Sequence, residues 1–286
     1  MRSPMDRAGS ALSAEKLAMS HITATFRRLH DNTTPLRLPN AWDAGSARLF
    51  ESLGATAIAT TSAGVAWTLG FQDGRRLPVN EAIAAASRIA RVLTIPLSVD
   101  VENGYSDNPQ VVAGHVMRLV DLGVAGINIE DGPDEATLLA SKIEAIRAAL
   151  SKAGADLFVN ARCDVFLAGV VEKPKRVEES ILRGKLYAGA GADGLFLPGM
   201  SQAEQIEAVV SEVTLPLNVM AWPDLADAAE LGRLGVRRLS TGSGISQALW
   251  SKAETLARDF LQSGSSQPLA EASMPYGQLQ GLFCVQ

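Results

Sequence analysis

Carboxylates are crowded at the end of one apolar run in this chain. The stretch LSVDVENGYSD, residues 97–107, places Asp100 and Glu102 two positions apart, and Glu130 and Arg162 end two later apolar runs. Residues two apart on a strand share a side, so these three carboxylates and one guanidinium are predicted to converge. Carboxylates in one cavity repel each other and raise each other's pKa unless a cation is present. Because hard oxygen ligands with room for water suit Mg²⁺ or Mn²⁺, the three acids predict a metal site.

The elements that must position these side chains follow a repeating pattern. Short runs rich in Val, Ile, Leu and Ala are candidate strands at 36–39, 57–60, 97–101, 126–129, 157–161, 194–197, 217–219 and 237–240. Helical spacing lies between them at 43–53, 79–93, 109–122, 134–152, 175–190, 201–212, 224–234 and 245–262. Alternating strands and helices predict parallel pairing and an α/β fold, a (β/α)8 TIM barrel over residues 21–265. A doubly wound open sheet is the alternative, but LPNAWDAGSA does not match its G-x-G-x-x-G fingerprint.

In such a barrel the chemistry takes place on the loops that follow the strands. The residues at the predicted strand ends are Asn40, Trp42, Asp43, Thr61, Ser62, Gly64, Asp100, Glu102, Asn103, Glu130, Asp131, Asn160, Arg162, Asp164, Asn218, Thr241 and Ser243. Helix capping is the competing role for Asp43, Asp131 and Ser243, and a structural ion pair is the competing role for Arg162. The Gly-Ser loop at 240–244 is weak evidence for a phosphate site.

Composition limits the classes of function. The 286 residues are 47% hydrophobic and 20% charged, with a formal net charge of -5, so no basic surface for nucleic acid is expected. No apolar run approaches the roughly 20 residues that span a bilayer. Cys163 and Cys284 are too few for a disulfide framework or a zinc cluster, which favours the cytoplasm. Residues 1–20 are predicted to be a disordered arm without a secretory signal, with Met19 a candidate natural start, and 266–286 a C-terminal tail.

Two other kinds of catalysis are disfavoured. No lysine ends a predicted strand, which argues against a Schiff-base aldolase. The histidines fall in the N-terminal arm and in helices, so none is an obvious catalyst. Strand alternation turns Cys163 away from the side of Arg162, and it is predicted to be a small buried residue.

Four ordered motifs together carry a family resemblance: LPNAWDAGSARLFESLGATAIATTSAGVAWTLGFQDG, SVDVENGY, GINIEDG and VNARCDVF. They resemble the isocitrate lyase/phosphoenolpyruvate mutase superfamily, in its phosphonomutase-like and 2-oxo acid lyase branch, from about residue 24 to residue 260. The resemblance implies a Mg²⁺-dependent barrel that breaks or makes C–C or P–C bonds of small 2-oxo acids. It also implies a homo-oligomer, a dimer or a tetramer, whose last helix is exchanged between neighbours.

The resemblance also implies roles for individual residues. Asp100 matches the direct metal ligand, Glu102 a ligand that acts through water, and Glu130 the acid of the fourth strand. Family members often have Asp at the position of Glu102. The predicted catalytic residues are Arg162, Asp73 and Glu130. The predicted substrate-binding residues are Trp42, Thr61, Ser62, Ala63, Asn160, Arg162 and Asn218, with backbone N–H groups and a hydroxyl of 61–63 placed over the 2-oxo carboxylate.

One loop departs from the family pattern. Isocitrate-type lyases carry a Lys-Lys-Cys-Gly-His loop, and mutases carry a gating loop with Lys and Asn, whereas this chain reads GPDEATLL at 132–139. The sequence therefore predicts a Mg²⁺-dependent lyase or decarboxylase that cleaves a C–C bond of a small 2-oxo or hydroxy dicarboxylate through an enolate. The alternatives are a P–C bond enzyme of the phosphonopyruvate hydrolase or phosphoenolpyruvate mutase type, and a barrel that binds 2-oxo acids without turnover.

Overall fold

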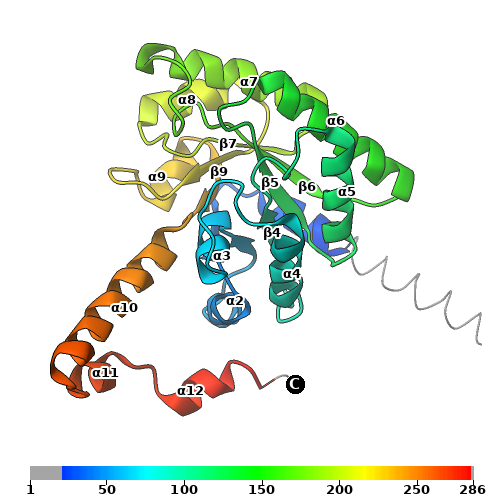
Figure 1. The fold of residues 1–286 in the computed structure, drawn as a ribbon. Helices are drawn as coiled ribbons and strands as arrows, with labels where there is room; N and C mark the ends of the chain where they lie inside the picture. The colour runs from blue at the N-terminus through cyan, green and yellow to red at the C-terminus, as the bar shows by residue number, and fades with distance from the viewer. Residues whose placement is uncertain (1–20, 285–286) are drawn as a thin grey trace, which may run out of the picture.

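A parallel β-barrel forms the centre of the computed structural model, which describes residues 21–284 (Figure 1). The strand order is β1-β9-β8-β7-β6-β5-β4-β3-β2, with every pair parallel. The first predicted strand is split at Pro39, which has no N–H to donate, into β1 (Leu36–Leu38) and β2 (Asn40–Ala41). Because β1 pairs with β9 and β2 pairs with β3, this split stretch closes the sheet. The predicted TIM-type barrel is confirmed; the predicted arm, residues 1–20, lies outside the described residues.

Helices alternate with the strands, as predicted. The remaining strands are β3 (Ile58–Thr60), β4 (Leu97–Asp100), β5 (Gly126–Glu130), β6 (Phe158–Arg162), β7 (Gly194–Phe196), β8 (Leu217–Met220) and β9 (Val236–Ser240). The helices around them are α2 (Ala44–Ser52), α3 (Ser62–Thr68), α4 (Val79–Ala90), α5 (Pro109–Val120), α6 (Ala136–Ala153), α7 (Arg176–Ala190), α8 (Ala203–Glu212) and α9 (Ala228–Arg233). The short helix α3 was not predicted, because its seven residues were assigned to the loop after the second strand.

Three residues that were candidates for helix caps have different fates. Asp43 caps α2, since its carboxylate accepts from the Ser46 N–H at 2.7 Å while the Ser46 hydroxyl accepts from the Asp43 N–H at 3.2 Å. Ser243 precedes α10 (Gly244–Ser263) without a side-chain capping bond. The Asp131 carboxylate accepts hydrogen bonds from two side chains of α7 instead of capping the start of a helix. The capping role is therefore confirmed for Asp43 and wrong for the other two.

The two larger of the three apolar clusters in residues 21–284 pack the strands of the barrel against helices. Side chains on the outer face of the strands, such as Val99 and Ile127, pack against the helices in the larger cluster. Cys163 belongs to it and is fully buried, which confirms that it faces away from the barrel interior, and burial raises the pKa of its thiol. The smaller cluster contains Phe26, from helical residues 21–29, and Phe158. The N-terminal helix thus covers one end of the barrel.

The C-terminal helices extend away from the barrel (Figure 1). Helix α10 is followed by α11 (Gln267–Ala272) and α12 (Tyr276–Gly281), within the stretch predicted as a tail. Large apolar side chains are exposed on α10, with Trp250 54% and Leu261 83% accessible. Within residues 21–284, no helix combines the length and the apolar character needed to cross a bilayer.

Candidate active site

The C-terminal ends of β4, β5 and β6 bring the predicted charges together. Glu130 and Arg162 are opposite each other in the β5–β6 register, and Arg162 Nη1 lies 2.7 Å from Glu130 Oε2. The same nitrogen lies 4.0 Å from Asp100 Oδ2. Residues opposite each other on paired strands point to the same side, so the ion pair follows from the register. The predicted convergence of Asp100, Glu130 and Arg162 is therefore present.

Asp164 holds the opposite edge of the Arg162 guanidinium. Arg162 Nε donates to Asp164 Oδ1 at 2.7 Å, and Nη2 donates to Oδ2 at 2.9 Å. Such a two-bond pair fixes the plane of the guanidinium as well as its position. Asp164 was predicted to lie at the rim, without a role of its own. Its spacing of two residues from Arg162 was the signal that the two side chains share a side.

The turn after β4 folds Glu102 back over Asp100. The Glu102 N–H donates to Asp100 Oδ1 at 3.0 Å, and the Asp100 N–H donates to Thr60 Oγ1 at 2.8 Å. Glu102 and Tyr105 have left-handed backbone angles, with φ of 48° and 61°, and Gly104 lies between them at 88°. Non-glycine residues in this region cost of order 1 kcal/mol each, so the surrounding contacts must hold the turn.

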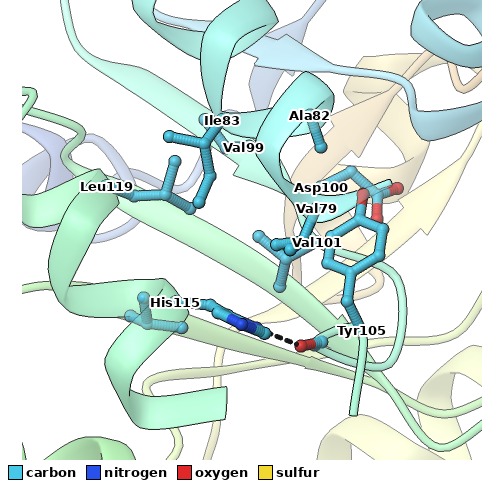
Figure 2. Close-up of a pocket in the computed structure, with 11 residues that line it drawn as sticks. Val79, Ala82, Ile83, Val99, Asp100, Val101, Tyr105, His115 and Leu119 are labelled. Carbon is cyan, nitrogen blue, oxygen red and sulfur yellow. Dashed lines mark hydrogen bonds between the residues drawn. The ribbon is translucent and has the colours of Figure 1, made fainter. Parts of the chain in front are cut away.

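Helices α5 and α6 supply those contacts. His115 Nδ1 lies 3.0 Å from the Gly104 carbonyl, and Lys142, which is buried, donates from Nζ to the Asn103 carbonyl at 3.0 Å. Figure 2 shows the His115 contact and the Tyr105 ring beside Asp100, around a cavity of about 20 Å³. Tyr105 was not predicted as a site residue. Its ring lies beside the Asp100 side chain and lines the same cavity (Figure 2).

Asp100, Glu102 and Glu130 form an acid cluster, and burial raises the pKa of each of its carboxyl groups. It raises the pKa of Asp100 and of Glu130, against the opposing effect of the Arg162 charge. It raises the pKa of Glu102 to about 7, with further contributions from the Asp100 and Asp73 charges. Asp73 itself is exposed on the loop between α3 and α4. When Asp100, Glu102 and Glu130 are all ionised, their negative charge exceeds the single positive charge of Arg162, and a bound cation would offset the excess.

The donor set fits a hard divalent ion in kind. Asp100, Glu102 and Glu130 offer carboxylate oxygens, the ligands that Mg²⁺ prefers. Over residues 21–284, no three His, Cys, Asp or Glu side chains are arranged as a ready-made metal site. Glu130 is engaged with Arg162 instead.

The predicted carboxylate-binding segment lies at the start of α3. The Thr61 N–H already donates to the Ala41 carbonyl at 3.0 Å, and Thr61 Oγ1 accepts from the Gly64 N–H at 3.5 Å. Ser62 and Ala63 form the first turn of α3, where N–H groups have no acceptor within the helix. Trp42 is adjacent, because a Cβ on Gly64 would lie 2.8 Å from Trp42 Cβ.

Asn160 and Asn218 lie deeper than the mouth. Asn160 Nδ2 donates to Asn128 Oδ1 at 2.9 Å and to Asn218 Oδ1 at 3.1 Å, and both residues are 1% exposed. They form a layer of buried amide side chains inside the barrel. This layer lies below Arg162, because Asn160 precedes Arg162 by two residues on β6. The structure thus separates these two predicted substrate-binding residues from the acid cluster.

Arg75 joins two loops beside the cluster and was missed from the sequence. Its N–H donates to Glu102 Oε2, and its guanidinium pairs with Asp134 at 2.7 Å. Asp134 belongs to the loop that departs from the family pattern. No sequence signal marked Arg75, because its partners are far away along the chain.

Comparisons with known proteins show which family the chain belongs to. The profile of the family described as phosphoenolpyruvate phosphomutase matches residues 26–261. An uncharacterized protein of Mycobacterium tuberculosis is 38% identical over 261 residues, covering 90% of this chain and 95% of that protein. Oxaloacetate decarboxylase of Pseudomonas fluorescens is 30% identical over 246 residues, covering 80% of this chain and 81% of its own.

A solved structure supports the same relationship. A Burkholderia cenocepacia protein, provisionally assigned as a phosphonomutase, is 36% identical with a TM-score of 0.79, covering 83% of this chain and 99% of that chain. The family profile spans most of the barrel. The chain therefore belongs to the phosphoenolpyruvate phosphomutase family, and it is an enzyme of the isocitrate lyase/phosphoenolpyruvate mutase superfamily.

Proposed function

We propose that this enzyme is a Mg²⁺-dependent lyase that cleaves a C–C bond of a small 2-oxo dicarboxylate, and that oxaloacetate is decarboxylated to pyruvate. The observation that carries the proposal is the guanidinium of Arg162, fixed by Asp164 and directed at Glu130 and Asp100. Oxaloacetate is chosen because decarboxylases of this substrate are 30% identical to the chain over most of its length.

The reaction requires stabilisation of one developing negative charge. When the C3–C4 bond of oxaloacetate breaks, C4 leaves as CO₂ and its bonding electrons form the enolate of pyruvate, which then takes a proton at C3. Arg162 can donate to the enolate oxygen, and such a preorganised donor stabilises the transition state more than the substrate. The N–H groups of Ser62 and Ala63 can hold the C1 carboxylate.

The metal ligands in this proposal are Asp100, Glu102 and Glu130. When bound, Mg²⁺ would polarise the 2-oxo group and share the charge of the enolate. Asp73 is assigned to the site by its match to the family's loop aspartate and by its electrostatic effect on Asp100 and Glu102. Trp42 would form the apolar side of the pocket.

A substrate screen tests the proposal. The purified enzyme would be incubated with Mg²⁺ and either oxaloacetate or phosphonopyruvate, and pyruvate would be measured against enzyme-free blanks. Pyruvate from oxaloacetate alone is the expected result. Pyruvate from phosphonopyruvate alone would assign P–C cleavage instead. Saturable binding of a 2-oxo acid without any turnover would mean that the barrel only binds such acids.

We also propose that the enzyme is a cytoplasmic homo-oligomer whose C-terminal helices pack on a second copy. The helix α10 extends beyond the barrel (Figure 1) and exposes large apolar side chains, including Trp250 and Leu261. Exposed apolar surface of this kind commonly marks protein interfaces. Light scattering on the intact chain would distinguish a dimer from a tetramer, and a monomer at micromolar concentration would contradict the proposal.

A further inference from the structure

Asp131 is a buried carboxylate that the proposed chemistry does not use. Its side chain has 0% exposure, although it directly follows Glu130. Oδ2 accepts from Arg183 Nη1 at 2.8 Å and from the Tyr187 hydroxyl at 2.5 Å. Oδ1 accepts from the Asp164 N–H at 2.8 Å. We call Asp131, Arg183 and Tyr187 the α7 bracket.

The α7 bracket reaches the proposed active site through the loop after β6. It fixes the backbone of Asp164, whose carboxylate binds Arg162 by two hydrogen bonds. The Asp131 N–H also donates to the Arg162 carbonyl at 3.1 Å, so the bracket holds both ends of the segment 162–164. A continuous series of contacts therefore runs from α7 to the guanidinium.

The helix α7 presents its side of the bracket in a fixed spacing. Arg183 and Tyr187 are four residues apart and lie on one face of the helix. Glu179, four residues before Arg183, accepts from Arg183 Nε at 2.6 Å and so orients the guanidinium. Tyr187 is fully buried. A buried carboxylate with three donors is costly to disturb, because loss of a donor leaves charge without a partner.

We infer that Arg183 and Tyr187 are positioning residues for Arg162, acting through Asp131 and Asp164. This inference rests on the proposed function, in which Arg162 meets the enolate. A misplacement of about 1 Å in a reacting group can cost on the order of 10²-fold in rate. Loosening the bracket should therefore lower turnover even though neither α7 residue touches the substrate.

Tyr187→Phe is the direct test, because it removes one hydroxyl and keeps the ring. We expect kcat to fall about tenfold while KM stays within about twofold. This is the pattern expected when the contact of Arg162 with the transition state is weakened. Arg183→Lys should show a smaller loss than Arg183→Met, since lysine keeps a charged donor for Asp131. The matched control is Arg147→Lys, at an ion pair with Asp193 outside the proposed site, which should lower Tm without changing kcat.

A second measurement does not depend on turnover. Exchange of the Arg162 Nε–H with solvent can be followed by ¹⁵N NMR, with the signal identified by its loss in Arg162→Lys. We expect exchange to be at least fivefold faster in Tyr187→Phe than in the wild type. Unchanged exchange together with unchanged kcat would overturn the inference. Faster exchange in an enzyme that turns over no 2-oxo acid would support the positioning role while refuting the proposed function.

Discussion

Arg162→Lys separates the charge of the guanidinium from its shape. Arg162 uses two nitrogens on Asp164, at 2.7 and 2.9 Å, and a third on Glu130 at 2.7 Å. One ammonium group cannot span both carboxylates, so the fixed orientation is lost while the positive charge stays. Removal of one preorganised donor to an oxyanion costs about 3 to 4 kcal/mol in the transition state. We therefore expect kcat for oxaloacetate to fall on the order of 10²–10³-fold.

The assay must separate lost chemistry from lost folding. Pyruvate release would be coupled to lactate dehydrogenase, with the spontaneous decarboxylation of oxaloacetate subtracted, and Tm would be measured on the same preparation. Loss of about two charged hydrogen bonds, partly replaced by lysine, should lower Tm by no more than about 8 °C. A variant that melts far earlier, and whose folded fraction turns over at the wild-type rate, would refute a catalytic role for Arg162. Arg162 would then be a scaffold ion pair.

Three further outcomes are expected. Chelation with EDTA should abolish activity and lower Tm, and Mg²⁺ or Mn²⁺ should restore both, so full activity after exhaustive chelation would exclude the metal site. Cys163→Ser should keep kcat while losing about 1 to 3 kcal/mol of stability, because a hydroxyl replaces a thiol in an apolar cluster; a loss of kcat like that of Asp100→Asn would contradict this. Burial lowers the pKa of His30 from 6.5 to about 3, so the folded state binds fewer protons than the unfolded state below pH 6.5. The free energy of unfolding should therefore decrease as the pH falls below 6.5, by about 2 kcal/mol at pH 5. Urea titrations should find this loss absent in His30→Asn.

The barrel and its charged rim could be predicted because both depend on local patterns. Strand alternation predicted that Glu130 and Arg162 share a side and that Cys163 faces away, and the pairing of β5 with β6 agrees. The split of the first strand also follows from a local cause, Pro39, although residues 36–39 were predicted to be one strand.

Contacts between distant segments could not be predicted in this way. Asp131 has the sequence signature of a helix cap, and only the packing of α7 against the barrel provides Arg183 and Tyr187 as better partners. Asn160 was predicted to be a rim residue because it lies near the end of its strand. It precedes the last residue of β6 by two positions, however, and therefore lies one layer deeper in the barrel. Arg75 reaches Asp134 across two loops, and no periodicity records that meeting.

The carboxylates that surround Arg162 affect the order in which molecules enter the barrel. Asp100, Glu130 and Asp164 share this single guanidinium, and Glu102 lies beside them, so the mouth has a formal charge of −3 when all four acids are ionised. A dianion such as oxaloacetate is repelled by that field, whereas a divalent cation is attracted to it. Ordered addition should result, with the metal ion entering first. Initial rates measured over a grid of Mg²⁺ and oxaloacetate concentrations should then show a substrate that has little affinity for the metal-free enzyme.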